Sequence, residues 1–206
     1  MATDLELLDA WRQGDDRAGK ALFERHFRAL YRFFRNKAAE AIDDLVQQTF
    51  LGCVEGRDRL RDDASFRTYM FTVARNQLFR HWKRRSSVRD DAEFETRSLH
   101  DMSPTPSNVL VHRAEERVVL EALRRIPFVF QVALELYYFE NMRGPEIAAV
   151  LDVPEATVRS RLRRGLDHLR RQVEVIAESA DVLHSTLTNL EQWASGVRTH
   201  VERATA

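Results

Sequence analysis

Apolar residues recur along the chain at the three- and four-residue spacing of amphipathic helices, and no stretch shows the strict alternation of a strand. The sequence therefore predicts an all-α protein. Residues 4–37 predict helices with an aromatic-rich buried stripe. That stripe consists of Phe23, Phe27, Leu30, Tyr31 and Phe34.

Further helices are predicted over four stretches, which are 41–56, 64–85, 109–139 (with Pro127 as an internal boundary) and 143–171. Residues 86–108 break the pattern, because they hold five Ser, both prolines of a Pro-Thr-Pro triplet and few apolar residues. We therefore predict two small helical domains joined by a flexible linker. The ranges are 1–88 for the first domain, 89–112 for the linker, 113–172 for the second domain and 173–206 for a helical C-terminal extension.

The C-terminal extension carries a seam of apolar residues whose steps alternate between three and four, which predicts a helix. The seam consists of Val173, Ile176, Ala180, Leu183, Leu187, Leu190, Ala194, Val197 and Val201. Three roles stay open for this helix: a structural hairpin against its own domain, intramolecular regulation by packing on the basic surfaces, and self-association.

Composition narrows the class of protein. The 206 residues hold 32 Lys+Arg and 32 Asp+Glu, so net charge does not favour disorder. One cysteine, Cys53, excludes an internal disulfide framework and a Cys-rich zinc module. The N-terminus does not look like a secretory signal, and no apolar run approaches the roughly 20 residues of a membrane span. We expect a cytoplasmic protein without membrane insertion.

The zero net charge conceals basic and acidic blocks that alternate along the chain. Residues 57–89 carry net +7 and residues 155–171 carry net +4, whereas residues 90–122 carry net −5 and residues 173–206 carry net −3. Two separated basic blocks favour two contacts with a polyanion.

The first basic block contains the segment from Phe66 to Arg85, which interleaves aromatic and cationic residues. The aromatics are Phe66, Tyr69, Phe71, Phe79 and Trp82, and the cations are Arg67, Arg75, Arg80, Lys83, Arg84 and Arg85. Cations reach phosphates and aromatic faces hold unstacked bases, so the segment favours nucleic-acid binding.

The second basic block contains a predicted helix-turn-helix from Arg143 to Arg164, with its turn at Asp152-Val153-Pro154. Its second helix presents Arg159, Ser160, Arg163 and Arg164 outward. A helix of this size fits the DNA major groove, where Arg binds guanine in a bidentate manner.

A polar helical face follows from Asp44, Gln47, Gln48 and Leu51, which are spaced at i, i+3, i+4 and i+7. By itself this face is compatible with plain solvent-exposed surface. The chain offers no catalytic constellation: its seven His form no HExxH pattern, and neither a Gly-rich phosphate loop nor GxSxG occurs. We predict no enzyme, no cofactor and no metal site.

Together these motifs resemble the extracytoplasmic-function (ECF) family of bacterial RNA polymerase sigma factors over roughly residues 4–172. The segment DLVQQTF resembles the polymerase-clamp motif, FRTYMFTVARN with KRR resembles the minus-ten segment, and PEIAAVLDVPEATVRSRLRRGLDHL resembles the minus-thirty-five helix-turn-helix. Three positions depart from the family pattern: Tyr69 replaces a usual Trp, Arg80 a common Asp, and Gln131 a frequent Arg.

The resemblance implies a sigma region 2-like first domain, a region 4-like second domain, and a function as a transcription initiation factor. Polymerase binding is assigned to Asp44, Leu45, Gln47, Gln48 and Leu51. Minus-ten binding is assigned to Arg61, Ser65, Phe66, Tyr69, Arg75, Asn76, Arg80, Lys83, Arg84 and Arg85. Minus-thirty-five binding is assigned to Thr157, Arg159, Ser160, Arg161, Arg163 and Arg164.

The implied partners are core RNA polymerase and promoter DNA, both as duplex and as melted strand. Control by an anti-sigma factor or by the C-terminal extension stays open. Two rival functions also stay open: a helix-turn-helix regulator with an N-terminal sensor or interaction domain, and an adaptor that binds polymerase without initiating transcription.

Overall fold

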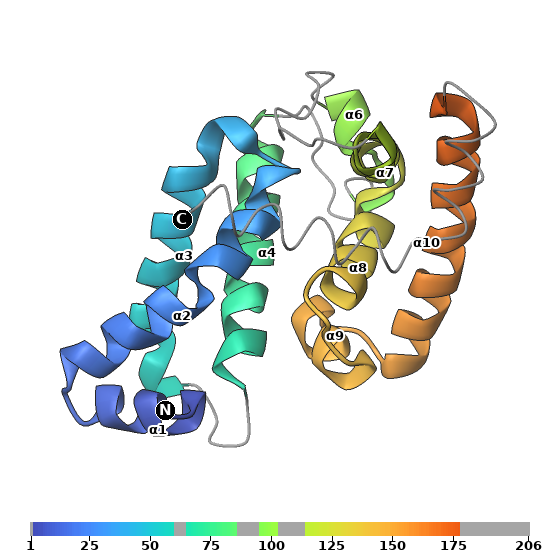
Figure 1. The fold of residues 1–206 in the computed structure, drawn as a ribbon. Helices are drawn as coiled ribbons and strands as arrows, with labels where there is room; N and C mark the ends of the chain where they lie inside the picture. The colour runs from blue at the N-terminus through green and yellow to red at the C-terminus, as the bar shows by residue number, and fades with distance from the viewer. Residues whose placement is uncertain (1, 60–64, 86–94, 103–113, 178–206) are drawn as a thin grey trace.

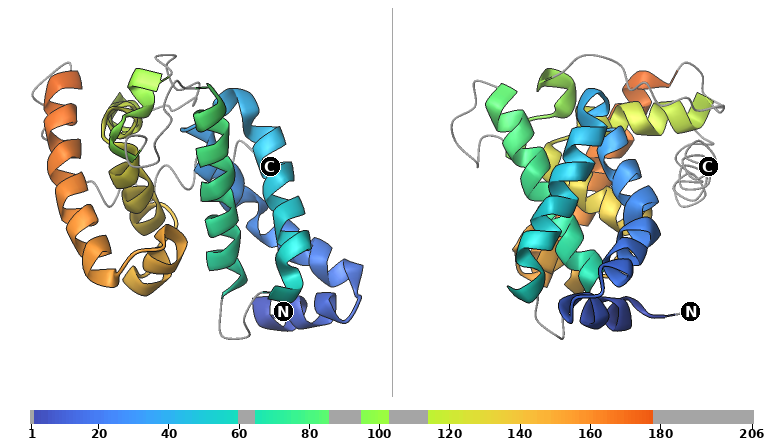
Figure 2. Two further views of the ribbon diagram at one scale, coloured as in Figure 1. Left: turned by 180° about the vertical axis from the view of Figure 1, so that it is seen from behind. Right: turned by 90° about the vertical axis from the view of Figure 1, so that its left-hand side faces the viewer.

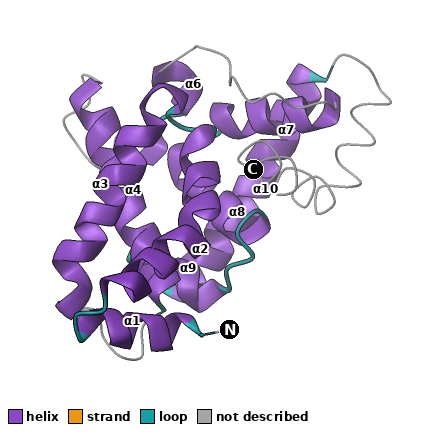
Figure 3. Cartoon of the chain, turned by 60° about the vertical axis from the view of Figure 1, so that its left-hand side comes forward, coloured by secondary structure: helices purple, strands orange, loops and turns teal. Residues whose placement is uncertain are grey.

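The computed structural model describes residues 2–59, 65–85, 95–102 and 114–177, and these ranges contain helices and no strand (Figure 3). The prediction of an all-α protein is confirmed. In chain order the helices are α1 (Asp4–Arg12), α2 (Asp16–Arg35), α3 (Ile42–Gly56), α4 (Phe66–Arg85), α6 (Leu99–Met102), α7 (Ala114–Arg125), α8 (Phe128–Tyr138), α9 (Gly144–Leu151) and α10 (Glu155–Ile176), with 3-10 turns η1 (Ala39–Ala41) and η2 (Arg57–Arg59).

Local sequence signals set where the first helices begin. Thr3 and Glu6 form a capping box at the start of α1, and the Asp15 side chain accepts hydrogen bonds from the first amides of α2. Between them Gly14 adopts φ +99°, which only glycine reaches without strain. The predicted helical stretch 4–37 is therefore two helices that turn at this glycine.

Helices α1–α4, here called the N-terminal half, bury the predicted aromatic stripe only in part: Phe27 is 38% exposed, so the prediction of a buried position is wrong there. Leu30 and Phe34 are fully buried, and the Phe23 ring stacks on Phe50 of α3 with centroids 4.5 Å apart. Burial of apolar area at about 25 cal/mol per Å² drives this packing. Cys53 is fully buried in the same core, as an inert structural thiol should be.

Helices α6–α10, here called the C-terminal half, contain the predicted helix-turn-helix. Pro127 and Pro154 occupy the N-cap positions of α8 and α10, where a missing amide hydrogen costs nothing. Asp152 ends α9 in the left-handed conformation (φ 53°) and so turns the chain toward α10. The predicted boundaries at Pro127 and at the 152–154 turn are confirmed.

The two halves share one hydrophobic core. Met70, Ala74 and Leu78 of α4 belong to the same buried cluster as Ile147 and Val150 of α9. Helices α4 and α9 are in direct contact, and Figure 1 shows the C-terminal half beside α4. Helix α10 lies at the outer edge of the C-terminal half in Figure 1 and in the rear view of Figure 2.

Part of the predicted linker forms α6 and packs against the rest of the C-terminal half. Leu99 is fully buried, Ser98 bridges Pro127, and the Phe128 amide donates to the Arg97 carbonyl at 2.9 Å. At the other end of the domain, Val173 is fully buried, and α10 continues to Ile176. The predicted tail helix beyond residue 177 lies outside the described residues.

Candidate nucleic-acid and protein-binding surfaces

The polar face predicted on α3 is exposed to solvent. Asp44 and Gln47 are exposed, and the Gln48 amide donates to the Asp44 carboxylate at 2.8 Å. Leu51 exposes 53% of its surface next to these polar groups. An exposed leucine among amides and a carboxylate is suited to a protein contact.

An open apolar groove of about 380 Å³ adjoins this face between α2 and α3. Its lining combines the exposed side of the aromatic stripe with residues of α3, namely Phe23, Phe27, Asp43, Val46, Gln47, Phe50, Leu51 and Val54. Because Gln47 and Leu51 belong to both the groove and the polar face, the two form one continuous surface.

The last turns of α4 present a row of exposed cations. Asn76, Arg80, Lys83, Arg84 and Arg85 are all exposed. Lys83 Nζ lies 5.8 Å from the centroid of the Phe79 ring, and Arg85 pairs weakly with Glu40 at 3.8 Å. This end of α4 keeps its charges available for a polyanion.

Two predicted contact residues are buried instead. Leu45 is 0% exposed and Phe66 is 2% exposed, so both belong to the core. The prediction that they contact a partner directly is wrong: each supports the surface that its neighbours form. Trp82, another member of the basic-aromatic segment, is also buried. Helical periodicity explains all three, because these positions lie on the buried sides of α3 and α4.

Tyr69 is half-buried, and its hydroxyl donates to the Gly52 carbonyl at 3.3 Å, across the contact between α3 and α4. Ser65 is exposed at the start of α4. Arg61 lies outside the described residues. The predicted minus-ten set is therefore divided: a cationic group at the end of α4, and a smaller group near its start.

Two predicted DNA-contacting arginines share one carboxylate. Arg75 Nη2 of α4 lies 3.0 Å from Glu95 Oε1, and Arg161 Nη2 of α10 lies 3.3 Å from Glu95 Oε2. Burial lowers the pKa of Arg161. Both arginines are largely covered, in contrast to the cations around them.

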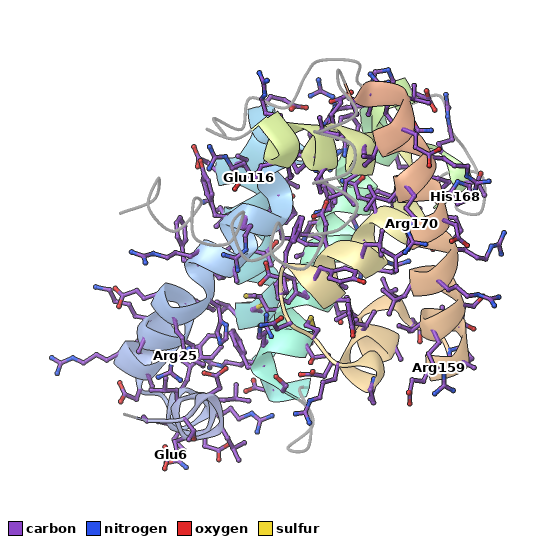
Figure 4. The ribbon with its side chains drawn as sticks, turned by 45° about the vertical axis from the view of Figure 1, so that its right-hand side comes forward. Glu6, Arg25, Glu116, Arg159, His168 and Arg170 are labelled. Carbon is purple, nitrogen blue, oxygen red and sulfur yellow. The ribbon has the colours of Figure 1, made fainter. Side chains whose placement is uncertain are left out.

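The remaining cations of α10 face solvent. Arg159, Arg163 and Arg164 are exposed, while Thr157 and Ser160 are half-buried. Arg159 extends from the first turns of α10 in Figure 4, where it pairs with Glu155 at 3.4 Å. Arg164 stacks over the Phe130 ring at 5.5 Å. The three arginines form the outward face of the second helix of the helix-turn-helix, as predicted, whereas Ser160, also predicted to face outward, is half-buried.

Sequence reasoning missed a charged network between the two halves. Arg32 of α2 and Arg67 of α4 both bond Glu140, and Lys37 bonds Glu135 of α8. A signal was present in the apolar segment FVFQVALELYY, where Gln131 and Glu135 are spaced at i, i+4. Polar groups inside such a segment require buried partners. Gln131 is 0% exposed and donates to Glu135 at 2.9 Å.

The parts of the chain that the structure describes hold no cluster of His, Cys, Asp or Glu suited to a metal ion. None of the helices in the described ranges combines the length and the hydropathy that a transmembrane segment requires.

Two helical halves, one with a basic helix and the other with a basic helix-turn-helix, define a DNA-binding protein of two modules. The sequence signature described as Sigma-70 region 2 matches residues 22–88, and that of Sigma-70 region 4 matches residues 116–169. The fold and its surfaces therefore define a sigma-70-type transcription initiation factor.

Known proteins place the chain within this class. It is 25% identical over 181 residues to the ECF RNA polymerase sigma-E factor of Salmonella typhimurium, covering 84% of this chain and 95% of that protein. It is similar to CnrH, solved in complex with the cytosolic domain of CnrY, with 26% identity, a TM-score of 0.57, and coverage of 84% of this chain and 99% of that one.

A second solved structure supports the fold. The sigma factor RpoE of Bartonella quintana, in complex with the anti-sigma factor NepR, has 19% identity and a TM-score of 0.58 over 76% of this chain and 97% of that one. The chain belongs to the ECF family of RNA polymerase sigma factors, and it directs RNA polymerase to promoters.

Proposed function

We propose that the chain binds core RNA polymerase through the α3 face and the adjoining groove. The observation that supports this is the continuity of the exposed Asp44 and Gln47 with an apolar groove beside Leu51. Polar groups at the edge of an apolar surface give a protein interface both orientation and affinity. Leu45, from the buried side, holds α3 in place.

Promoter DNA would meet two separate surfaces. The exposed cations at the end of α4 contact the minus-ten element, and Arg159, Arg163 and Arg164 of α10 contact the minus-thirty-five duplex. The first surface includes the start of α4, where Ser65 and Tyr69 would contact an unstacked base. Extruding a base costs a few kcal/mol, which stacking and pocket contacts offset, so binding here aids melting.

The polymerase assignment is tested by Asp44→Ala combined with Gln47→Ala. Both side chains are exposed and lie outside the core, so the fold should survive while the affinity for core polymerase falls. The matched control is Lys20→Ala with Glu24→Ala, an exposed pair on α2. A pull-down assay measures binding to core polymerase, and circular dichroism checks that each variant keeps the native fold. Equal binding by both double variants would remove the α3 assignment.

The two DNA surfaces are separated by a second pair of variants. Arg163→Ala with Arg164→Ala should weaken binding to duplex promoter DNA by about 1–3 kcal/mol for each arginine that reads a base. Lys83→Ala with Arg84→Ala should mainly reduce binding to the melted strand and open-complex yield. The readouts are duplex binding and permanganate footprinting at moderate salt. If a double variant changes neither readout, the DNA contact assigned to its two residues is wrong.

Transcription with purified core polymerase separates this function from its rivals. Promoter-specific transcripts are expected. Binding to duplex DNA without any transcripts would favour a conventional helix-turn-helix regulator. An adaptor would be favoured if no transcripts form and polymerase binding survives loss of the α10 arginines.

As a transcription initiation factor the protein would carry no catalytic site of its own and would act in the cytoplasm with the polymerase. The similarity to CnrH, solved with the cytosolic domain of CnrY, supports control by an anti-sigma partner.

A further inference from the structure

Arg57, the first residue of the 3-10 turn η2, lies beside the proposed base site at the start of α4. It directly follows Gly56, which packs so closely against the Tyr69 hydroxyl that a Cβ atom there would collide with it. The same hydroxyl donates to the Gly52 carbonyl at 3.3 Å, one turn earlier in α3. Because Tyr69 is proposed to contact an unstacked base, a cationic residue stands one position away from that contact.

Two residues of α1 hold Arg57 in place. Arg12 Nε donates to the Arg57 carbonyl at 3.2 Å, and Arg57 Cζ lies 5.6 Å from the centroid of the Trp11 ring. The indole is itself fixed, because Trp11 is 3% exposed and packs edge-on against the Phe23 ring. A Cβ atom at Gly19 of α2 would lie only 2.6 Å from Trp11 Nε1. Both the main chain and the guanidinium of Arg57 therefore rest on a well-packed support.

The opposite end of α1 is anchored as well. The Asp4 carboxylate lies 2.6 Å from Arg25 Nη1 and 2.6 Å from His26 Nε2 of α2, and the His26 ring lies 5.6 Å from the ring of Phe66 at the start of α4. Helix α1 contacts both η2 and α4, and Figure 1 shows it at the end of the N-terminal half where α3 ends and α4 begins. With both ends anchored, α1 supports the base site from below.

The charge of Arg57 is available to a ligand. Its side chain is 31% exposed, and its ion pair within the described ranges is with Asp58, at 3.5 Å and with a carboxylate that is 75% exposed. An exposed pair of this kind contributes about 0–1 kcal/mol, so its exchange for a phosphate costs little. An arginine that stacks on an aromatic face keeps its in-plane N–H groups for a planar, bidentate contact with phosphate.

We propose that Arg57 binds a phosphate of the melted promoter strand next to the base at Tyr69, and that Trp11 and Arg12 act as positioning residues for this contact. The inference deepens the proposed minus-ten function and rests on it. Lys83 lies 14 residues beyond Tyr69, which is about 21 Å along α4. The melted strand is then held at two separate points, one near each end of α4.

The test uses the full-length chain assembled with core RNA polymerase, and fluorescein-labelled single-stranded DNA of mixed sequence as the probe. Arg57→Gln should weaken binding of the probe about fivefold, as expected for the loss of one partly exposed charge-assisted contact. The matched control is Arg28→Gln, which removes one positive charge from an exposed arginine of α2 and should leave the affinity unchanged. A pull-down checks that all variants bind core polymerase equally.

The salt dependence of binding reports on the phosphate contact itself. Each phosphate that a protein neutralises on a single strand contributes about 0.7 to the slope of log K against log salt concentration. Arg57→Gln should therefore reduce the magnitude of that slope by about 0.7. Arg57→Lys keeps the charge, so it should keep the slope, while it loses part of the affinity because lysine lacks the planar pair of donors.

The positioning role of Arg12 is tested by a double-mutant cycle. Arg12→Gln removes the bond to the Arg57 carbonyl and should weaken binding of the probe by less than Arg57→Gln does. In the double variant the affinity should match that of Arg57→Gln alone, because Arg12 acts through Arg57. Additive losses in variants with native circular dichroism would show that Arg12 acts independently of Arg57, which would overturn its positioning role.

Lys83→Ala with Arg84→Ala is the reference for the minus-ten function. If this variant loses affinity while Arg57→Gln binds as tightly as Arg28→Gln, the Arg57 contact is wrong and the minus-ten function stands. If Arg57→Gln weakens binding without changing the salt slope, Arg57 touches no phosphate, and the proposal is overturned. If the assembled protein binds the probe no more tightly than core polymerase alone, the minus-ten assignment fails and the Arg57 contact fails with it.

Discussion

Gly56, the last residue of α3, shows how one position can couple packing to a functional side chain. A Cβ atom at this position would collide with the Tyr69 hydroxyl, and its next neighbour would be Tyr69 Cζ at 2.9 Å. Tyr69 belongs to the predicted minus-ten set. The absence of a side chain at residue 56 therefore fixes where an aromatic residue of α4 lies.

Gly56→Ala should lower the free energy of unfolding by about 1–3 kcal/mol, the usual range for overpacking. Gly56→Ala with Tyr69→Phe should recover part of that loss, because the colliding oxygen is gone. Denaturant unfolding measures both. The control is Gly144→Ala, whose new Cβ would meet only the flexible Glu155 side chain, at 3.3 Å. A Gly56→Ala protein as stable as that control would contradict the prediction.

At the scale of elements, the turn between α9 and α10 determines the orientation of the recognition helix. Asp152 adopts the left-handed conformation at the end of α9, and the Val153 amide donates to the Ala148 carbonyl at 3.1 Å. Ile147 and Val158, one from each helix, are then both fully buried. The arginines of α10 face outward because this turn places Val158 inward.

Asp152→Ala should therefore cost about 1 kcal/mol of stability, because alanine lacks the short polar side chain that makes the left-handed conformation tolerable for aspartate. Asp152→Gly should equal the wild type or exceed it, because glycine adopts this conformation freely. Thermal unfolding, with duplex DNA binding as a second readout, checks both. A glycine variant less stable than the wild type would contradict this, because it would show that the Asp152 side chain contributes more to the turn than the freedom of glycine to adopt the left-handed conformation.

At the scale of the whole molecule, three histidines affect stability: His26 and His81, which are buried in the N-terminal half, and His168, which is half-buried in the C-terminal half. Burial lowers the pKa of His26 in α2 and of His81 in α4, although Asp4 lies 2.6 Å from His26 and opposes the shift. Desolvation likewise lowers the pKa of His168 in α10. In the unfolded chain, by contrast, these groups titrate near pH 6.5.

The unfolded state therefore binds more protons than the folded state below about pH 6.5, so stability should fall as the pH is lowered from about 6.5 toward 5. Denaturant midpoints at pH 8, pH 6 and pH 5 measure this. His26→Gln should make the slope shallower, because glutamine does not titrate. A slope unchanged by His26→Gln would assign the pH dependence to other groups.

The sequence by itself determined the all-α class, the breaks at Pro127 and at residues 152–154, and the exposed polar and charged residues of α3, α4 and α10 for which we predict binding roles. These features are local, because helical periodicity and turn chemistry are encoded within a few neighbouring residues. The motif assignment failed for Leu45 and Phe66, whose place in a motif implied contact with a partner although their side chains lie in the core.

Only the tertiary structure decided how the two halves meet. Glu140 is 108 residues from Arg32, and Glu95 is 66 residues from Arg161. No local pattern pairs charges over such separations, although Glu135 within an apolar segment indicated that a buried partner existed. The pairing follows from the shared core, which places α9 on α4; water is excluded from Glu140, whereas Glu95 stays 29% exposed. The sequence thus showed which arginines are suited to a polyanion, while the fold showed which acidic group of the chain itself pairs with two of them, Arg75 and Arg161.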